Sequence, residues 1–276
     1  MDNWGEVSIN LMQGLSNLEN LELKNCGGLL EVFKLEGLLT REGEQQNLLL
    51  PRLKKMWLHN LLELRCIWKG PTQCLNLDNL EHLKVFNCNE LKHLFTPTLA
   101  RSLHNLKFFE IETCDKLEHL IVEDKEDQIL SERDLQTLCF SKLEVVKVNE
   151  CNKLKCLFPV MIAHNLLELS SLKVKGTSQL VEVFTHEDEG DKLVQKDVTL
   201  PKLKDITLKR LPSLLNFFPR HYNVVMPALF KVQVQSCPNM TTSVAPTPDK
   251  TVHVIGEVST ILAVFIIFKF FLMYLL

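Results

Sequence analysis

The chain has 276 residues, a formal net charge of −3 and 7% aromatic residues. It lacks the basic excess with which proteins neutralise phosphates, which argues against a nucleic-acid partner. The opening residues "MDNWGEVSINLMQG" lack the basic and then apolar pattern of a secretory signal, so we expect the chain to face the cytosol.

Residues 1–14 form an N-terminal segment that would serve as a partial cap. One apolar pattern then recurs through residues 15–240. Each copy starts on an apolar residue and has further apolar residues three, six and eight positions later. The starting residues are Leu15, Leu50, Leu77, Leu103, Phe140, Leu166, Leu200 and Met226. The gap of two is typical of a short strand, whereas gaps of three suit turns and loose coils.

Eleven positions after five of these starts stands a cysteine, and fourteen positions after seven of the eight starts stands a leucine. The resulting form, L-x-x-L-x-x-L-x-L-x-x-C-x-x-L, is the signature of a leucine-rich repeat. We therefore predict an α/β repeat solenoid, a leucine-rich-repeat horseshoe of about eight irregular repeats with a parallel concave β-sheet, plus a C-terminal hydrophobic helix.

The recurring cysteine position predicts buried free thiols rather than disulfides. It is occupied by Cys26, Cys88, Cys114, Cys151 and Cys237. Free cysteine behaves as a small hydrophobe and packs well beneath a turn. The four other cysteines form no C-x-x-C pair, so we expect no zinc site.

Three polar insertions lengthen the connections between repeats, at residues 35–47, 123–134 and 185–197. The last two are strongly acidic. Insertions in solenoids map to loops, and we expect these charged runs to be solvated.

We predict a linker over residues 241–251 and a hydrophobic C-terminal segment over residues 252–276. As a helix, residues 258–276 would span about 28 Å against a hydrocarbon core of about 30 Å. Lys269 would cost about 2.5–3.5 kcal/mol at the membrane centre, whereas the apolar residues contribute about −4 to −8 kcal/mol. A transmembrane tail anchor is one interpretation; a buried cap of the solenoid and an aberrant gene end are the alternatives.

No segment matches a phosphate-binding loop, a nucleophile elbow or a zinc-protease motif, and the nine histidines form no recurring constellation. We therefore predict no catalytic residue, no cofactor and no metal, and a protein that is not an enzyme.

The residues five, seven and nine positions after each start would point outward on the concave face. They include eight lysines against four carboxylates, which predicts a protein partner with an acidic surface. Aromatic residues beside lysines are typical of protein-binding hot spots, although Trp57, Phe86 and Phe108 could instead stiffen the sheet. The predicted protein-binding residues are Lys55, Trp57, His59, His82, Lys84, Phe86, Phe108, Glu110, Glu112 and Lys147.

The repeats resemble those of plant coiled-coil nucleotide-binding leucine-rich-repeat disease resistance proteins. The likeness rests on "NCNELKHLF" (87–95) and "ECNKLKCLF" (150–158), and on the Leu-Pro openings of "LPRLKKMWLHNL" (50–61) and "LPKLKDITLKRLPSL" (200–214). Irregular repeat length with acidic insertions adds to it. The absence of a phosphate loop departs from these receptors and suggests a fragment that lacks the nucleotide-binding domain.

The resemblance implies a recognition module in plant defence that binds a pathogen effector or an effector-modified host protein, and that contacts a nucleotide-binding receptor domain. The alternative is a membrane-tethered leucine-rich-repeat adaptor or scaffold, whose cytoplasmic repeats would be anchored through residues 258–276.

Overall fold

The computed structural model describes residues 14–35, 49–70, 72–122, 139–185, 196–219, 222–240 and 253–255. Most of the three polar insertions, the N-terminal segment up to residue 13 and the apolar run 258–276 lie outside these residues. The predictions made for them therefore remain predictions.

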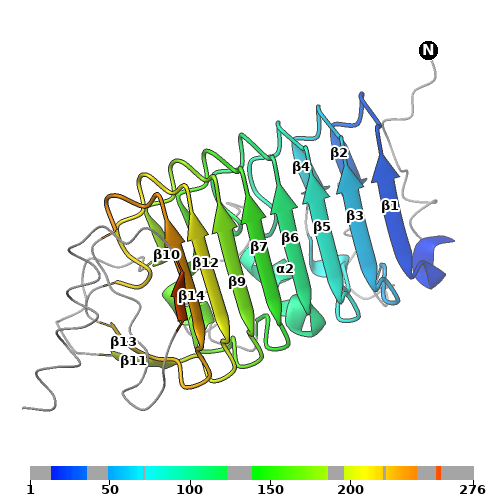
Figure 1. Ribbon diagram of the computed structural model, residues 1–276. Helices are drawn as coiled ribbons and strands as arrows, with labels where there is room; N and C mark the ends of the chain where they lie inside the picture. The colour runs from blue at the N-terminus through cyan, green and yellow to red at the C-terminus, as the bar shows by residue number, and fades with distance from the viewer. Residues whose placement is uncertain are drawn as a thin grey trace, which may run out of the picture.

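A parallel sheet of nine strands dominates the molecule (Figure 1). In sheet order the strands are β1 (Asn20–Lys24), β3 (Lys55–His59), β5 (His82–Phe86), β6 (Phe108–Glu112), β7 (Val145–Asn149), β9 (Ser171–Lys175), β12 (Asp205–Lys209), β14 (Lys231–Gln235) and β15 (His253–Ile255). The first eight lie where the repeat pattern predicts a strand, which confirms both the repeat and its register. Equivalent residues of neighbouring repeats pair directly, as Leu58 does with Val85 and Val85 with Ile111.

Six shorter strands form a second set, which the sequence analysis did not predict. They are β2 (Glu31–Lys34), β4 (Cys66–Lys69), β8 (Cys156–Pro159), β10 (Glu182–Thr185), β11 (Lys196–Thr199) and β13 (Tyr222–Val225). They pair two by two, β2 with β4, β8 with β10 and β11 with β13. A signal for the first four existed in the sequence, because each carries an aliphatic residue followed by Phe or Trp.

The helices are short and belong to the connections between repeats. They are α2 (Pro97–Ser102) and α4 (Val160–Ala163), with 3-10 turns η1 (Gly14–Asn17), η2 (Thr72–Cys74) and η3 (Leu103–Asn105). The Thr96 hydroxyl caps α2 by accepting a hydrogen bond from the Leu99 N–H, and Pro97 occupies the first turn, where its missing N–H costs nothing.

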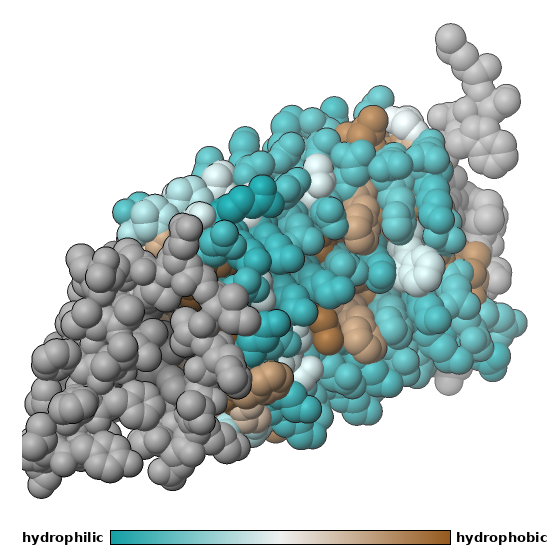
Figure 2. All heavy atoms as spheres, in the orientation of Figure 1, coloured by the Kyte–Doolittle hydropathy of each residue, from teal (hydrophilic) through white to brown (hydrophobic). Residues whose placement is uncertain are grey.

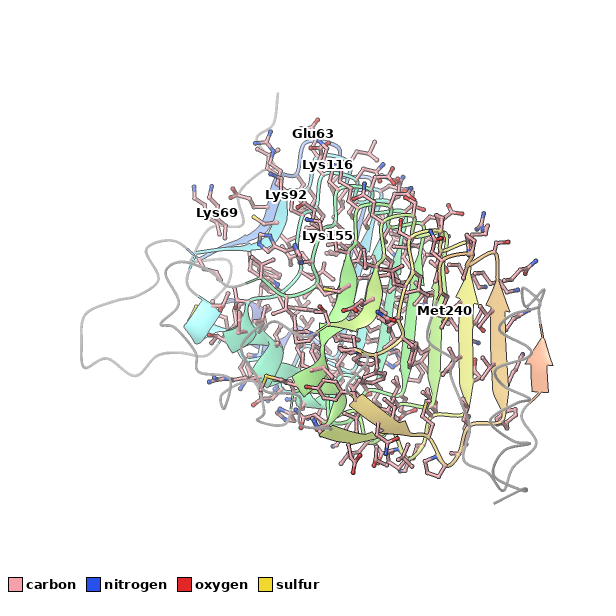
Figure 3. The ribbon with its side chains drawn as sticks, turned by 90° about the vertical axis from the view of Figure 1, so that its left-hand side faces the viewer. Glu63, Lys69, Lys92, Lys116, Lys155 and Met240 are labelled. Atoms are coloured by element: carbon pink, nitrogen blue, oxygen red, sulfur yellow. The ribbon has the colours of Figure 1, made fainter. Side chains whose placement is uncertain are left out.

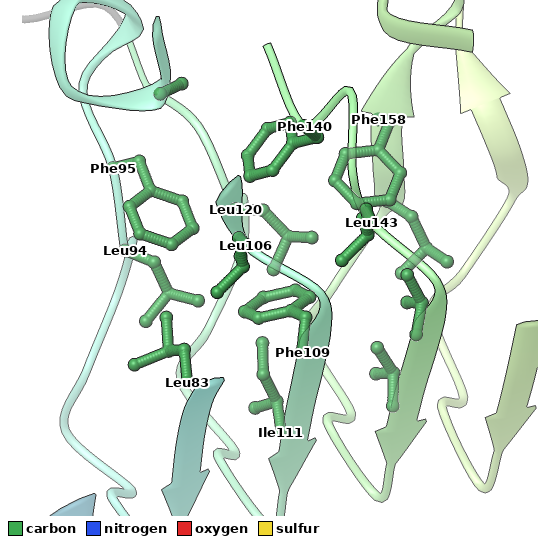
Figure 4. Close-up of a cluster of buried hydrophobic side chains, with 14 of the residues drawn as sticks. Leu83, Leu94, Phe95, Leu106, Phe109, Ile111, Leu120, Phe140, Leu143 and Phe158 are labelled. Carbon is green, nitrogen blue, oxygen red and sulfur yellow. The ribbon is translucent and has the colours of Figure 1, made fainter. Parts of the chain in front are cut away.

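The apolar repeat positions form one continuous core on the inner side of the sheet. Beside these aliphatic residues runs a row of aromatic rings from successive repeats, part of which is seen in Figure 4. Phe158 lies in the middle of this row, with its ring centroid 5.7 Å from that of Phe140 and 6.2 Å from that of Phe184. All three are fully buried, so each repeat is stabilised by its neighbours.

A residue with positive φ directly follows each of the eight predicted strands. Asn25, Asn60 and Asn87 adopt this conformation easily, and their amides form a ladder in which Asn60 donates to Asn25 at 2.8 Å and Asn87 to Asn60 at 3.0 Å. The backbone N–H of each also donates to the last strand carbonyl of the next repeat, as Asn87 does to Glu112. The sheet ladder thus continues through the turn.

The repeated cysteines follow directly, and all nine cysteines of the chain are free. Cys88, Cys114 and Cys151 are fully buried as predicted, and each thiol lies within hydrogen-bond distance of the carbonyl two residues earlier. The hydrogen bond with Cys114, followed by burial, raises the pKa of Cys88. Cys26 is exposed and Cys237 only partly buried, which corrects the prediction for the first and last repeats, where fewer repeats pack around the cysteine.

Only three residues of the C-terminal segment 252–276 are described, and they precede the helix predicted for residues 258–276. Residues His253–Ile255 form β15, which pairs in parallel with β14 through Lys231 and His253 and through Gln233 and Ile255. Across the described ranges, no helix has the length and apolar character needed to cross a membrane. Residues 258–276 lie outside those ranges.

Candidate protein-binding face

Side chains alternate along every strand, and those that do not enter the core form what we call the open sheet face. On β3, for instance, Met56 and Leu58 are fully buried, whereas Lys55, Trp57 and His59 keep exposed surface. This is the face that the sequence analysis expects to be concave. It is turned toward the viewer in Figure 1, and Figure 2 shows it to be largely hydrophilic, with apolar side chains interspersed over β3, β5 and β6.

Five rings gather on β3, β5 and β6, and we call Trp57, His59, His82, Phe86 and Phe108 the aromatic cluster. His59 stacks on Phe86 with ring centroids 5.1 Å apart, and His82 stacks on Phe108 at 4.6 Å. Each stack joins neighbouring strands, because the in-register pairing places equivalent residues side by side. The cross-strand contact that the sequence analysis held as an alternative is therefore present, though it links each phenylalanine to a histidine.

A row of charges crosses the same strands beside these stacks. The Lys84 ammonium lies 5.7 Å from the Trp57 ring centroid and 3.2 Å from a carboxylate oxygen of Glu110. The other Glu110 oxygen is 3.4 Å from the Lys147 ammonium. Because two lysines hold it and its side chain is only 18% exposed, Glu110 neutralises part of the predicted basic surface instead of being free to attract a basic partner.

Two polar ring atoms of the aromatic cluster are buried and have no hydrogen-bond partner among the described residues: Trp57 Nε1 and His59 Nε2. An unpaired buried polar atom costs about 1–3 kcal/mol. The indole N–H can only donate, whereas the imidazole nitrogen donates or accepts according to its tautomer. Neither atom is exposed to solvent, so a ligand would reach it only after the ring had moved.

The two histidines of the cluster favour the neutral form. Burial and then the nearby Lys24 charge lower the pKa of His59, and burial and then Lys55 lower the pKa of His82. Both rings therefore present neutral stacking surfaces near pH 7, where an ordinary histidine is already mostly neutral.

The ten residues predicted to bind protein all lie on the open sheet face, on β3, β5, β6 and β7. The structure joins eight of them in three sets: His59 with Phe86, His82 with Phe108, and Trp57, Lys84, Glu110 and Lys147 in a row. Lys55 and Glu112 lie beside these sets, Lys55 paired in register with His82 and Glu112 with Phe86. Their role in binding stays a prediction.

The outward lysines of β9, β12 and β14 lie on the same face. They were visible in the repeat pattern but were not among the predicted binding residues, because no aromatic residue accompanies them. Over the described ranges there is no group of three or more histidines, cysteines or carboxylates that could hold a metal ion.

The repeated strand, the inward leucines and the ordered outward face define a leucine-rich-repeat solenoid. The family model described as plant disease resistance protein RPS2-like, leucine-rich repeats, matches residues 3–115 and again residues 116–250. The chain belongs to this family. Neither the curated proteins nor the solved structures compared with it include a significant match. Leucine-rich repeats are generally non-catalytic modules that bind proteins, which supports a recognition role in plant defence.

Proposed function

We propose that the chain recognises a protein partner in plant defence through the open sheet face, with the aromatic cluster as the main contact. The observation that carries this proposal is the pair of cross-strand stacks, His59 on Phe86 and His82 on Phe108, on an otherwise hydrophilic face. Aromatic side chains dominate the energetics of protein interfaces and are enriched among the residues that contribute most to binding.

The partner under this proposal is a pathogen effector or a host protein that an effector has altered, and its contacting surface is acidic. A nucleotide-binding receptor domain is a second partner, consistent with the family to which the repeats belong. We place the repeats in the cytosol, where nine free thiols would remain reduced.

Site-specific photo-crosslinking tests the proposal directly. A photoreactive phenylalanine analogue would replace Phe86 in the full chain, and the matched control would carry the same group in place of Leu62, which is 50% exposed outside the open sheet face. We expect a discrete crosslinked protein from position 86 and none from position 62 in plant extract. Crosslinks from position 62 alone would place binding elsewhere.

A membrane-tethered adaptor is the second candidate function, and the apolar run Val258–Leu276 is the observation that favours it. The full chain should then sediment with membranes, and a chain that ends at residue 257 should not. Equal distribution of the two would remove this candidate.

A further inference from the structure

The open sheet face changes character beyond β7. Its outward positions on β9, β12 and β14 include four lysines, and we call Lys173, Lys175, Lys209 and Lys231 the lysine cluster. Asp205 is the only carboxylate at the outward positions of these three strands. It lies 3.6 Å from Lys173.

The remaining three lysines have no carboxylate of the described residues within ion-pair distance. Lys175 and Lys209 are direct cross-strand partners, so two like charges lie side by side without neutralisation. Such a pair is destabilising by itself. An anionic group placed between them would turn a repulsion into two attractions.

A straight row connects this lysine pair to the aromatic cluster. His59 pairs with Phe86, Phe86 with Glu112, Glu112 with Asn149, Asn149 with Lys175 and Lys175 with Lys209. With about 4.8 Å between strands, Lys175 and Lys209 lie roughly 14 and 19 Å from Phe86 along the row. An extended peptide that rises about 3.3 Å per residue covers that distance in about four to six residues.

From this geometry we propose that the open sheet face binds an extended acidic peptide segment of its partner, laid across the strands along this row. An apolar side chain of the segment contacts the aromatic cluster, and acidic side chains about four to six residues further along contact Lys175 and Lys209. Glu112 lies between the two subsites and repels an acidic side chain placed next to the apolar anchor. This inference rests on the proposed function and adds the chemistry of the ligand.

Selection from a random library of twelve-residue peptides, with the full chain as bait, tests the inference. Enriched peptides should carry an apolar residue with acidic residues at the stated spacing. The double variant Lys175→Glu/Lys209→Glu should prefer basic residues there and should bind the best wild-type peptide about tenfold more weakly or worse.

The matched control is Lys92→Glu/Lys155→Glu, which changes the net charge equally. Both control lysines are exposed, and Figure 3 shows them on the rim where the strands end. This variant should select the same peptides as the wild type. Circular dichroism would first establish that every variant is folded.

Several results would overturn the inference: no enrichment, enrichment without acidic residues, an unchanged preference in Lys175→Glu/Lys209→Glu, or displacement of the peptides by a single-stranded oligonucleotide. A further variant, Trp57→Ser/Phe86→Ser, distinguishes failure of the acidic-peptide inference from failure of the proposed function. Suppose that the selected peptides are apolar without acidic residues and that this variant no longer binds them. The open sheet face then binds protein, and only the acidic character of the ligand is wrong. If this variant keeps every peptide, the aromatic cluster is not the contact.

Discussion

The residue after each strand must adopt a left-handed conformation, and the repeats meet this demand unequally. Asn25, Asn60 and Asn87 suit it, as does Gly176 with φ of 63°, where an added Cβ would approach Glu150 Cγ to 3.0 Å. Thr113 has φ of 53°, although a β-branched side chain crowds this conformation. The amide ladder also stops at Asn87, one repeat before Thr113.

Thr113→Asn should therefore stabilise the protein by about 1 kcal/mol, because asparagine tolerates this conformation and could extend the ladder from Asn87. The urea midpoint should rise with an unchanged slope. Thr113→Ala is the control, since alanine relieves the branching but forms no ladder. If the asparagine variant were no more stable than the alanine variant, the ladder would contribute nothing.

His59 and His82 make stability depend on pH. Because their pKa values are lower in the folded state than the usual value near 6.5, the unfolded chain binds protons more readily. Stability should thus fall as the pH drops through 6.5 toward the lowered values. The drop in melting temperature between pH 7.5 and pH 5.5 should be smaller in His59→Asn/His82→Asn than in the wild type. Equal drops would contradict this account.

Among the elements, the eight main strands could be predicted from sequence because one side of each is filled by leucines at fixed spacing. β15 could not be predicted in this way. Counted back along the sequence from His253, the two positions that hold apolar residues at the opening of the other repeats hold Pro248 and Thr251. The short strands of the second set were missed because a four-residue strand is too brief to show alternation. Their aromatic residues form the buried row at Phe158 and Phe184.

β15 covers the edge of β14, which would otherwise present unpaired backbone groups. A chain that ends at residue 250 should therefore melt at a lower temperature and self-associate more than one that ends at residue 257. Both lack residues 258–276, so the comparison isolates β15. Sedimentation and thermal melting would measure the difference, and identical behaviour would show that β15 adds nothing to the edge.

At the scale of the whole molecule, the sequence predicts which residues share the open sheet face but not how they satisfy one another. The pairing of Glu110 with Lys84 and Lys147 depends on strand order and side-chain conformation. So do, among the described residues, the lack of a hydrogen-bond partner for the Trp57 N–H and the lack of a carboxylate within ion-pair distance of Lys175 and Lys209. A count of eight lysines against four carboxylates hides the division of this face into an aromatic end and a basic end.

The central claim is that the aromatic cluster recognises a protein, and quantitative affinity capture from plant extract tests it most directly. The full chain would be compared with Trp57→Ser/Phe86→Ser and with Leu62→Ser/Leu167→Ser, which alters two residues 50% and 48% exposed outside the open sheet face. With all three proteins folded, we predict a partner that the wild type and the second variant retain and the first variant loses. Retention of the same partner by all three would contradict the claim.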